Sequence, residues 1–203
     1  MAATGLFAKE RVITALRYWI PLAVVTTGLV GLVYLAAQQD LRMGANDLPA
    51  QIAQDTATSI GKGAEPWTVT GKEDVDIAAS LSSWTLVFDD TGKVAAGTPV
   101  ISGKLTVPPA GVFTAAKTSG ENRVTWQPRP GVRQAVVAVR IPGGRGVVMA
   151  GHSLREAERH IDQLTQMTGA AWVAILVIAF VACMLFLPAP ARVPAASAEA
   201  AEE

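Results

Sequence analysis

The sequence predicts an α+β domain with an antiparallel sheet, flanked by two transmembrane helices. Two stretches, Tyr18 to Ala37 and Gly169 to Leu187, contain no charged side chain, and each is about long enough to cross a bilayer as a helix. Between them lie about 130 residues of mixed polarity with turn signals throughout. Helical rhythms at both ends of this segment, with short β-branched runs between them, are typical of helices around a sheet.

The composition supports a membrane protein and excludes several functions. Half of the residues are hydrophobic (50%), and only 17% are charged, below the roughly 25% of a soluble domain. Lys and Arg (17) balance Asp and Glu (17), which disfavours binding to nucleic acid. Neither apolar stretch carries the ionisable groups that pumps and channels place at membrane depth, so transport by this chain alone is not expected.

The charges near the N-terminus predict the orientation. Lys9, Arg11 and Arg17 outweigh Glu10, so this end should stay in the cytoplasm. We therefore expect a two-pass protein of the inner (plasma) membrane, with the lipid bilayer as a partner. Its expected parts are a cytoplasmic basic N-terminus (1–17), a first transmembrane helix (18–37), an extracytoplasmic domain (38–168), a second transmembrane helix (169–187) and a disordered cytoplasmic tail (188–203).

A cleaved signal peptide is the alternative for the first stretch, with cleavage near Ala37. Its apolar core is nearer twenty residues than the 7–15 or so of a cleaved segment, which favours an uncleaved anchor.

The start of the exported segment is expected to be helical. Apolar residues follow a helical stripe from Gln38 to about Gly61. Pro49 should end or kink that helix, so we expect one helix leaving the membrane and a second piece beginning near Pro49.

Strand signals follow. Trp84 to Phe88 and Lys93 to Gly97 surround the turn Asp89 to Gly92, which predicts a hairpin. The further predicted strands are Val112 to Ala116, Arg123 to Gln127, Val132 to Ile141 and Val147 to Ala150.

The last element should be a helix that continues into the second span. Ser153 and Glu156 have the spacing of a capping box. An apolar stripe then follows at spacings of three and four, formed by Leu154, Ala157, Ile161, Leu164, Thr168 and Ala171. Such a rod can carry a small displacement across the membrane. Pairing of the stripe in a homodimer and docking on the chain's own sheet both fit.

This order of elements resembles a known family. An anchor, an exported helix, Val87 to Val94 as strand, turn and strand, and a terminal helix feeding a second anchor look like the extracytoplasmic PAS-like or Cache-type sensor region of bacterial two-component histidine kinases and chemoreceptors. Val124 to Arg133, followed by Ala150 to Glu156, is similar to the end of such domains. The resemblance covers roughly residues 10 to 187 and implies a PAS/Cache-like sheet.

The sequence also departs from that family. After Leu187 only about sixteen Pro/Ala-rich residues follow, without HAMP or kinase domains. We therefore expect a sensor or regulatory protein whose partner is a separate signalling kinase. The alternative is an accessory or structural subunit of a larger membrane complex, with the exported domain as a docking surface.

Arg133 is the strongest candidate for binding a ligand. Alternation along its strand places it on an apolar face with Ala135, Val137, Val139 and Ile141. An arginine there needs an anion or carbonyl partners, and a small carboxylate ligand would serve. An internal salt bridge or a guanidinium that reaches the surface is the alternative.

Two further residues are candidates for the same pocket. Trp126 could form a wall of it, and Arg129 could reach over its mouth from the following turn. Packing in the core is the alternative for the tryptophan.

The junction between sheet and terminal helix is the candidate for signal coupling. His152 precedes the helix, where a change of charge would act on the helix start, although an ordinary exposed histidine also fits. The residues expected to couple are His152, Ser153, Leu154, Glu156, Ile161 and Leu164.

Catalysis, cofactors and metal ions are not expected. The chain has none of the common nucleophile or phosphate-binding motifs, and its one cysteine, Cys183, lies in the second span. Asp74 and Asp76 lack the spacing of a calcium loop, and Asp89 with Asp90 is explained by a turn.

Overall fold

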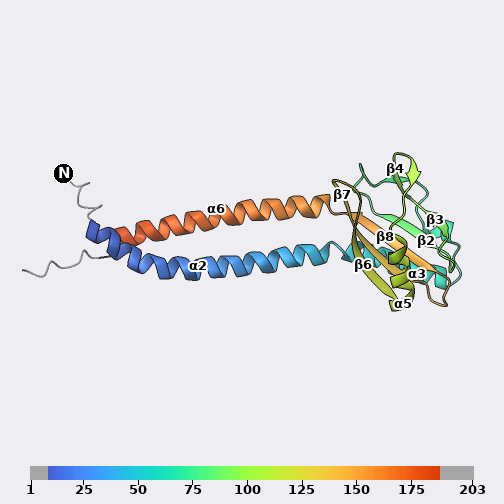
Figure 1. Cartoon of the computed structure of the whole chain (residues 1–203), viewed down its shortest axis with the longest axis horizontal. Helices are drawn as coiled ribbons and strands as arrows, with labels where there is room; N and C mark the ends of the chain where they lie inside the picture. The colour runs from blue at the N-terminus through green and yellow to red at the C-terminus, as the bar shows by residue number, and fades with distance from the viewer. Residues whose placement is uncertain (1–8, 188–203) are drawn as a thin grey trace, which may run out of the picture. The chain divides into compact units, whose positions relative to one another are not determined.

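The computed structural model describes residues 9–187 (Figure 1). The expected tail, 188–203, and the first part of the basic N-terminus lie outside the described residues. By internal contacts the described residues form two compact units, 9–36 with 164–187 (the helical unit) and 37–163 (the domain).

The two long helices confirm the predicted apolar elements. α2 (Lys9–Gly44) contains the first stretch, and α6 (Arg155–Phe186) contains the second except for its last residue, Leu187. Both helices are long and apolar enough to cross a membrane by length and composition. α6 has 32 residues and continues through Gly169 without a break, as the apolar stripe predicts. Both helices expose most of their apolar side chains, as a surface in contact with lipid would require.

Within the helical unit, α2 and α6 lie side by side and exchange polar contacts (Figure 1). The Trp19 indole donates to the carbonyl of Leu176 at 2.9 Å, and the Trp172 indole donates to the Thr27 hydroxyl at 3.0 Å. The Tyr34 and Thr165 hydroxyls are 2.8 Å apart. In an apolar surrounding each of these donors needs a partner, and the neighbouring helix supplies it.

The chain enters the domain through a helix break. α2 ends at Gly44 and α3 (Asp47–Gly61) begins three residues later, so the break precedes Pro49. Pro49 is the third residue of α3, where a backbone N–H has no partner inside the helix, so a proline is tolerated. The predicted second helix is therefore confirmed. The first helix ends at Gly44, before Pro49 is reached, so the proline does not end it.

The main sheet of the domain is antiparallel and five-stranded, in the order β3-β2-β8-β7-β6. Its strands are β2 (Trp84–Phe88), β3 (Val94–Gly97), β6 (Glu121–Arg129), β7 (Val132–Arg140) and β8 (Val147–Ser153). The predicted hairpin and three of the other four predicted strands are confirmed.

The fourth, Val112 to Ala116, is wrong: these residues lie in the helix α5 (Ala110–Ser119). Val112 and Ala116 are four residues apart, so a helix brings both to one face, and both are buried in the core. Gly120, at φ 91°, ends the helix.

The domain also has a second, smaller sheet with three strands in the order β1-β4-β5. It consists of β1 (Val75–Asp76), β4 (Pro99–Ile101) and β5 (Lys104–Leu105), preceded by the single turn α4 (Pro66–Val69). β1 pairs with β4 in parallel, so the domain is not purely antiparallel.

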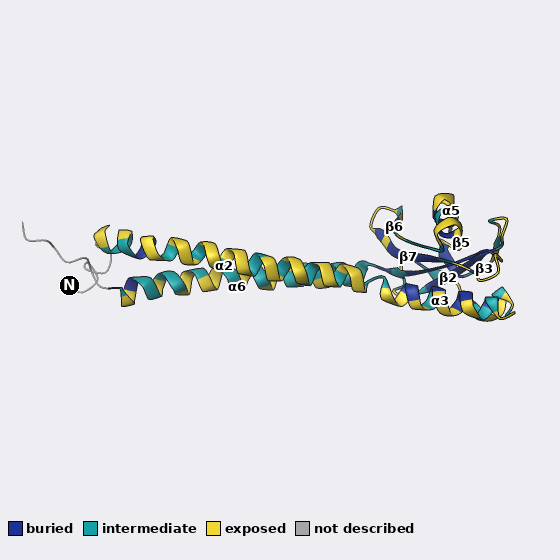
Figure 2. Ribbon diagram, turned by 90° about the horizontal axis from the view of Figure 1, so that it is seen from below, coloured by how far each residue is buried: buried dark blue, intermediate teal, exposed yellow. Residues whose placement is uncertain are grey.

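Both faces of the main sheet are covered, α3 on one side and α5 on the other (Figure 2). The α5 side packs Trp84, Leu86, Trp126, Val136 and Met149. The α3 side packs Ala53, Ala57, Val87, Val148 and Ala150. The domain thus has an apolar layer on each side of the sheet, which explains why β2 and β8 are buried nearly throughout.

One buried polar side chain links this core. Gln134, 1% exposed, accepts from the Trp84 indole at 3.1 Å and donates to the carbonyl of Ile77 at 3.1 Å. Because both ends of the amide are satisfied, its burial costs little and fixes the position of the Trp84 ring.

Candidate functional site

The domain contains a cleft of about 600 Å³, a size typical of small-molecule sites. It is formed by the end of α2, the helix break, β6, β7 and the first turns of α6. Its polar lining residues are Arg42, Asn46, Thr125, Arg133, Glu158 and Asp162. Its apolar lining residues are Ala45, Ala135, Leu154, Ala157 and Ile161.

Arg133 lines this cleft and forms an ion pair inside it. Its guanidinium donates to the carboxylate of Glu158 at 2.5 Å, and the two side chains are 47% and 42% exposed. The backbone amide of Leu154 also donates to the Arg133 carbonyl at 3.0 Å. The start of β7 is therefore joined to the start of α6 by a side-chain and a backbone contact, and the internal salt bridge considered for Arg133 is present.

The cleft is lined by short side chains on the sheet and by charged side chains around them. Thr125 and Ala135 are paired residues of β6 and β7, so their short side chains leave room beside Arg133. The lining includes two guanidinium groups and two carboxylates. The cleft therefore presents both charge signs in equal number to a solute.

Trp126 does not join this site. In register it pairs with Gln134 rather than Arg133, and successive residues of a strand face opposite sides. Trp126 is 8% exposed and packs against Trp84 in an edge arrangement with centroids 5.9 Å apart. The expected shared pocket with Arg133 is thus contradicted by the register, and the core packing considered for Trp126 is what the structure has.

Arg129 also lies outside the cleft. Its guanidinium donates to the Ser102 hydroxyl at 3.3 Å, in the turn between β4 and β5. Because a register shift separates Trp126 from Arg129 in the β6–β7 pairing, simple alternation does not place this side chain.

The junction of β8 and α6 is held by more contacts than the sequence indicates. His152 Nδ1 lies 3.1 Å from the Ser83 hydroxyl. Arg155 donates to the carbonyls of Ala78 and Ala79, at 2.6 and 3.4 Å. Sequence reasoning missed Arg155, since an arginine in a first helical turn gives no signal of a distant carbonyl partner.

The capping box predicted from Ser153 and Glu156 takes another form. The Ser153 hydroxyl accepts from the amide of Arg155 at 3.4 Å, and Ser153 is the last residue of β8. Glu156 is exposed. The sheet pairing of Ser153 with Gln134 holds it in an extended strand, so the helix begins at Arg155, one residue later than the motif implies.

The remaining coupling candidates divide between the two units. Leu154 and Ile161 line the cleft. Leu164 belongs to the helical unit and is half-buried there.

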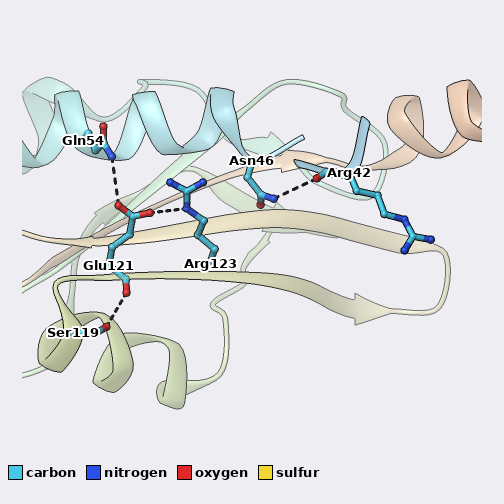
Figure 3. Close-up of polar contacts among 6 residues, drawn as sticks. All are labelled: Arg42, Asn46, Gln54, Ser119, Glu121 and Arg123. Atoms are coloured by element: carbon cyan, nitrogen blue, oxygen red, sulfur yellow. Dashed lines mark hydrogen bonds and ion pairs between the residues drawn. The ribbon is translucent and has the colours of Figure 1, made fainter. Parts of the chain in front are cut away.

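A polar cluster flanks the cleft on the same face of β6 (Figure 3). Arg123 donates to Glu121 at 2.6 Å, and Gln54 of α3 donates to the other oxygen of Glu121 at 3.4 Å. Arg42 points away from this pair (Figure 3). Alternation along β6 places Glu121, Arg123 and Thr125 on one face, a signal that the sequence contains.

Asp89 has the turn role expected of it. Its pKa is held below the ordinary value, chiefly because the Thr91 hydroxyl donates to it at 2.7 Å and the Lys93 amide at 2.9 Å. Within residues 9–187 no group of three potential metal ligands comes together.

Comparison with protein-family models, with curated proteins and with solved structures finds no match to this chain.

Proposed function

We propose that this chain is a membrane-anchored sensor or regulatory protein. Its extracytoplasmic domain detects a small ligand or envelope signal, and α6, as the second transmembrane helix, transmits the signal to a separate partner such as a signalling kinase. The observation that carries the proposal is that the first turns of α6 form one wall of the cleft. A solute in the cleft therefore touches the element that leaves the domain.

The ion pair between Arg133 and Glu158 supports this coupling. It joins the sheet to α6 through two half-exposed side chains, which a ligand can separate without exposing the core. Glu158 and Phe186 belong to one uninterrupted helix, so a shift or rotation at the cleft is carried along the rod.

The topology of the sheet also supports the proposal. The main sheet is antiparallel and lies between two helices, α3 and α5, as the α+β sensor domain of the proposal requires. The basic residues Lys9, Arg11 and Arg17 support a cytoplasmic N-terminus and hence an exported domain.

The proposal is tested on the purified full chain in lipid nanodiscs. A ligand from a metabolite panel should raise the melting temperature, because binding to the folded state alone stabilises it. A kinase or other signalling protein should co-purify from native membranes. Absence of both a thermal shift and such a partner would contradict the proposal.

The second candidate is an accessory subunit of a membrane complex. It is favoured by apolar side chains that the domain exposes, Trp67 (65%), Leu105 (49%) and Val107 (44%). Cross-linking in native membranes separates the two candidates: a stoichiometric complex with a transporter or envelope enzyme, lost on Trp67→Ser, would favour this one.

A further inference from the structure

We infer that the cleft takes a small zwitterion, a molecule with an anionic and a cationic group on one short chain. This inference rests on the proposed sensor function and names the ligand class of the same site. It follows from the pairing of charges in the cleft.

The cleft has a balanced set of charges. Arg42 and Arg133 can hold an anion, whereas Glu158 and Asp162 can hold a cation. The other polar groups, Asn46 and Thr125, are neutral and can hydrogen-bond either end of a solute.

The Arg133–Glu158 ion pair determines which ligand can bind without leaving one of these two charges unpaired. Arg133 and Glu158 satisfy each other in the empty cleft. An anion that captures Arg133 leaves Glu158 without its partner, and a cation that captures Glu158 does the same to Arg133. A zwitterion inserted between them replaces one ion pair by two, so each of the two half-exposed protein charges keeps an oppositely charged hydrogen-bond partner.

The same exchange explains how such a ligand would act on α6. Insertion must widen the contact between Arg133 on β7 and Glu158 on α6. The hydrogen bond from the Leu154 amide to the Arg133 carbonyl holds the residue just before α6 on the sheet. The movement is therefore restricted to α6 itself. Opening the pair thus displaces the first turns of α6.

The domain offers a matched control. Arg123 and Glu121 form the other ion pair found within residues 9–187, with similar exposure (49% and 35%). Neither residue lines the cleft. A loss of binding that follows from a general change of charge would appear in variants of both pairs.

The experiment measures binding of defined probes to the full chain in nanodiscs by calorimetry and thermal shift. The zwitterions are glycine, β-alanine and γ-aminobutyrate, and the singly charged analogues are butyrate and butylammonium. We expect one zwitterion to bind at least about tenfold more tightly than its analogues. Arg133→Gln and Glu158→Gln should each weaken it at least about tenfold, and Arg123→Gln less than about twofold.

A double variant shows whether the single variants lose binding because the ion pair is lost or because they fail to fold. Arg133→Glu with Glu158→Arg re-forms the ion pair with its direction reversed and should bind the zwitterion within about fivefold of the parent chain. Equal binding of butyrate, or binding indifferent to Arg133 and Glu158, would overturn the zwitterion and leave the sensor proposal standing. If no zwitterion bound, the zwitterion inference would be overturned; if, in addition, no metabolite of the panel bound and no signalling partner co-purified, the sensor proposal would be overturned as well.

Discussion

The carboxylate of Asp89 shows how one residue closes a hairpin. It accepts from the Thr91 hydroxyl and from the amides of Thr91 and Lys93, and these bonds favour its charged form. A carboxyl with a lowered pKa in the folded state stabilises the fold above its unfolded pKa of about 3.8, and this contribution is lost as pH falls through the folded value.

We therefore expect Asp89→Ala to lower the melting temperature at pH 7, with a difference that shrinks as the pH falls below about 3.8. Melting curves from pH 7 to pH 3 check this. Asp90→Ala is the control, because Asp90 contributes its backbone carbonyl to Lys117 and keeps that group in the variant. A difference independent of pH would contradict the assignment.

Gly151 is required by the ring of Trp84. A Cβ at this position would lie 2.2 Å from two ring atoms, and the Gln134 amide prevents the ring from moving away. Gly151→Ala should therefore lower the free energy of unfolding by about 1–3 kcal/mol. Gly111→Ala, which meets nothing within 4 Å, should change it by less than about 0.5 kcal/mol. Equal effects of the two substitutions would contradict the close packing of the Trp84 ring on Gly151.

At the residue scale, alternation along one strand was enough to predict the face on which Arg133 lies, but not whether Trp126 shares that face. The apolar face that contains Ala135 and Val137 follows from alternation within one strand, and so does the need of Arg133 for a partner. Which residue of β6 lies opposite depends on the register, and an irregularity between Trp126 and Arg129 shifts it. Glu158 as the partner depends on tertiary structure and had no local signal.

At the scale of elements, length and periodicity determined what could be predicted. The hairpin, β7, β8 and the uninterrupted α6 follow from long or strongly patterned segments. Val112 to Ala116 was misread because a short run with β-branched residues fits a strand and a helix equally well. Its burial against the sheet, which decides the outcome, is a tertiary effect.

The contact between α2 and α6 also gives a prediction. The Trp172 indole donates to the Thr27 hydroxyl at 3.0 Å. Trp172→Phe and Thr27→Val should each destabilise the helix pair, and a double-mutant cycle should give a coupling of about 0.6 kcal/mol, the average for such bonds in membranes. Reversible unfolding in bicelles measures it. Additive effects would show that the bond contributes nothing.

At the scale of the whole molecule, a sensory role for the domain depends on the side of the membrane on which it lies. α2 and α6 satisfy the length and composition of membrane spans, and the sequence predicted both from the absence of charge. The orientation rests on the basic residues before the first span. Neither the cleft nor its coupling to α6 has a sensory role unless the domain is exported between two retained anchors.

The most direct test combines labelling with the mass of the mature chain. In a Cys183→Ser background, a cysteine is introduced at Gly144, in the β7–β8 turn, and intact cells are treated with a membrane-impermeant maleimide. We expect labelling before lysis, together with a mature chain that keeps residues 18–37. Labelling only after lysis, or a mature chain that begins near Gln38, would contradict the account.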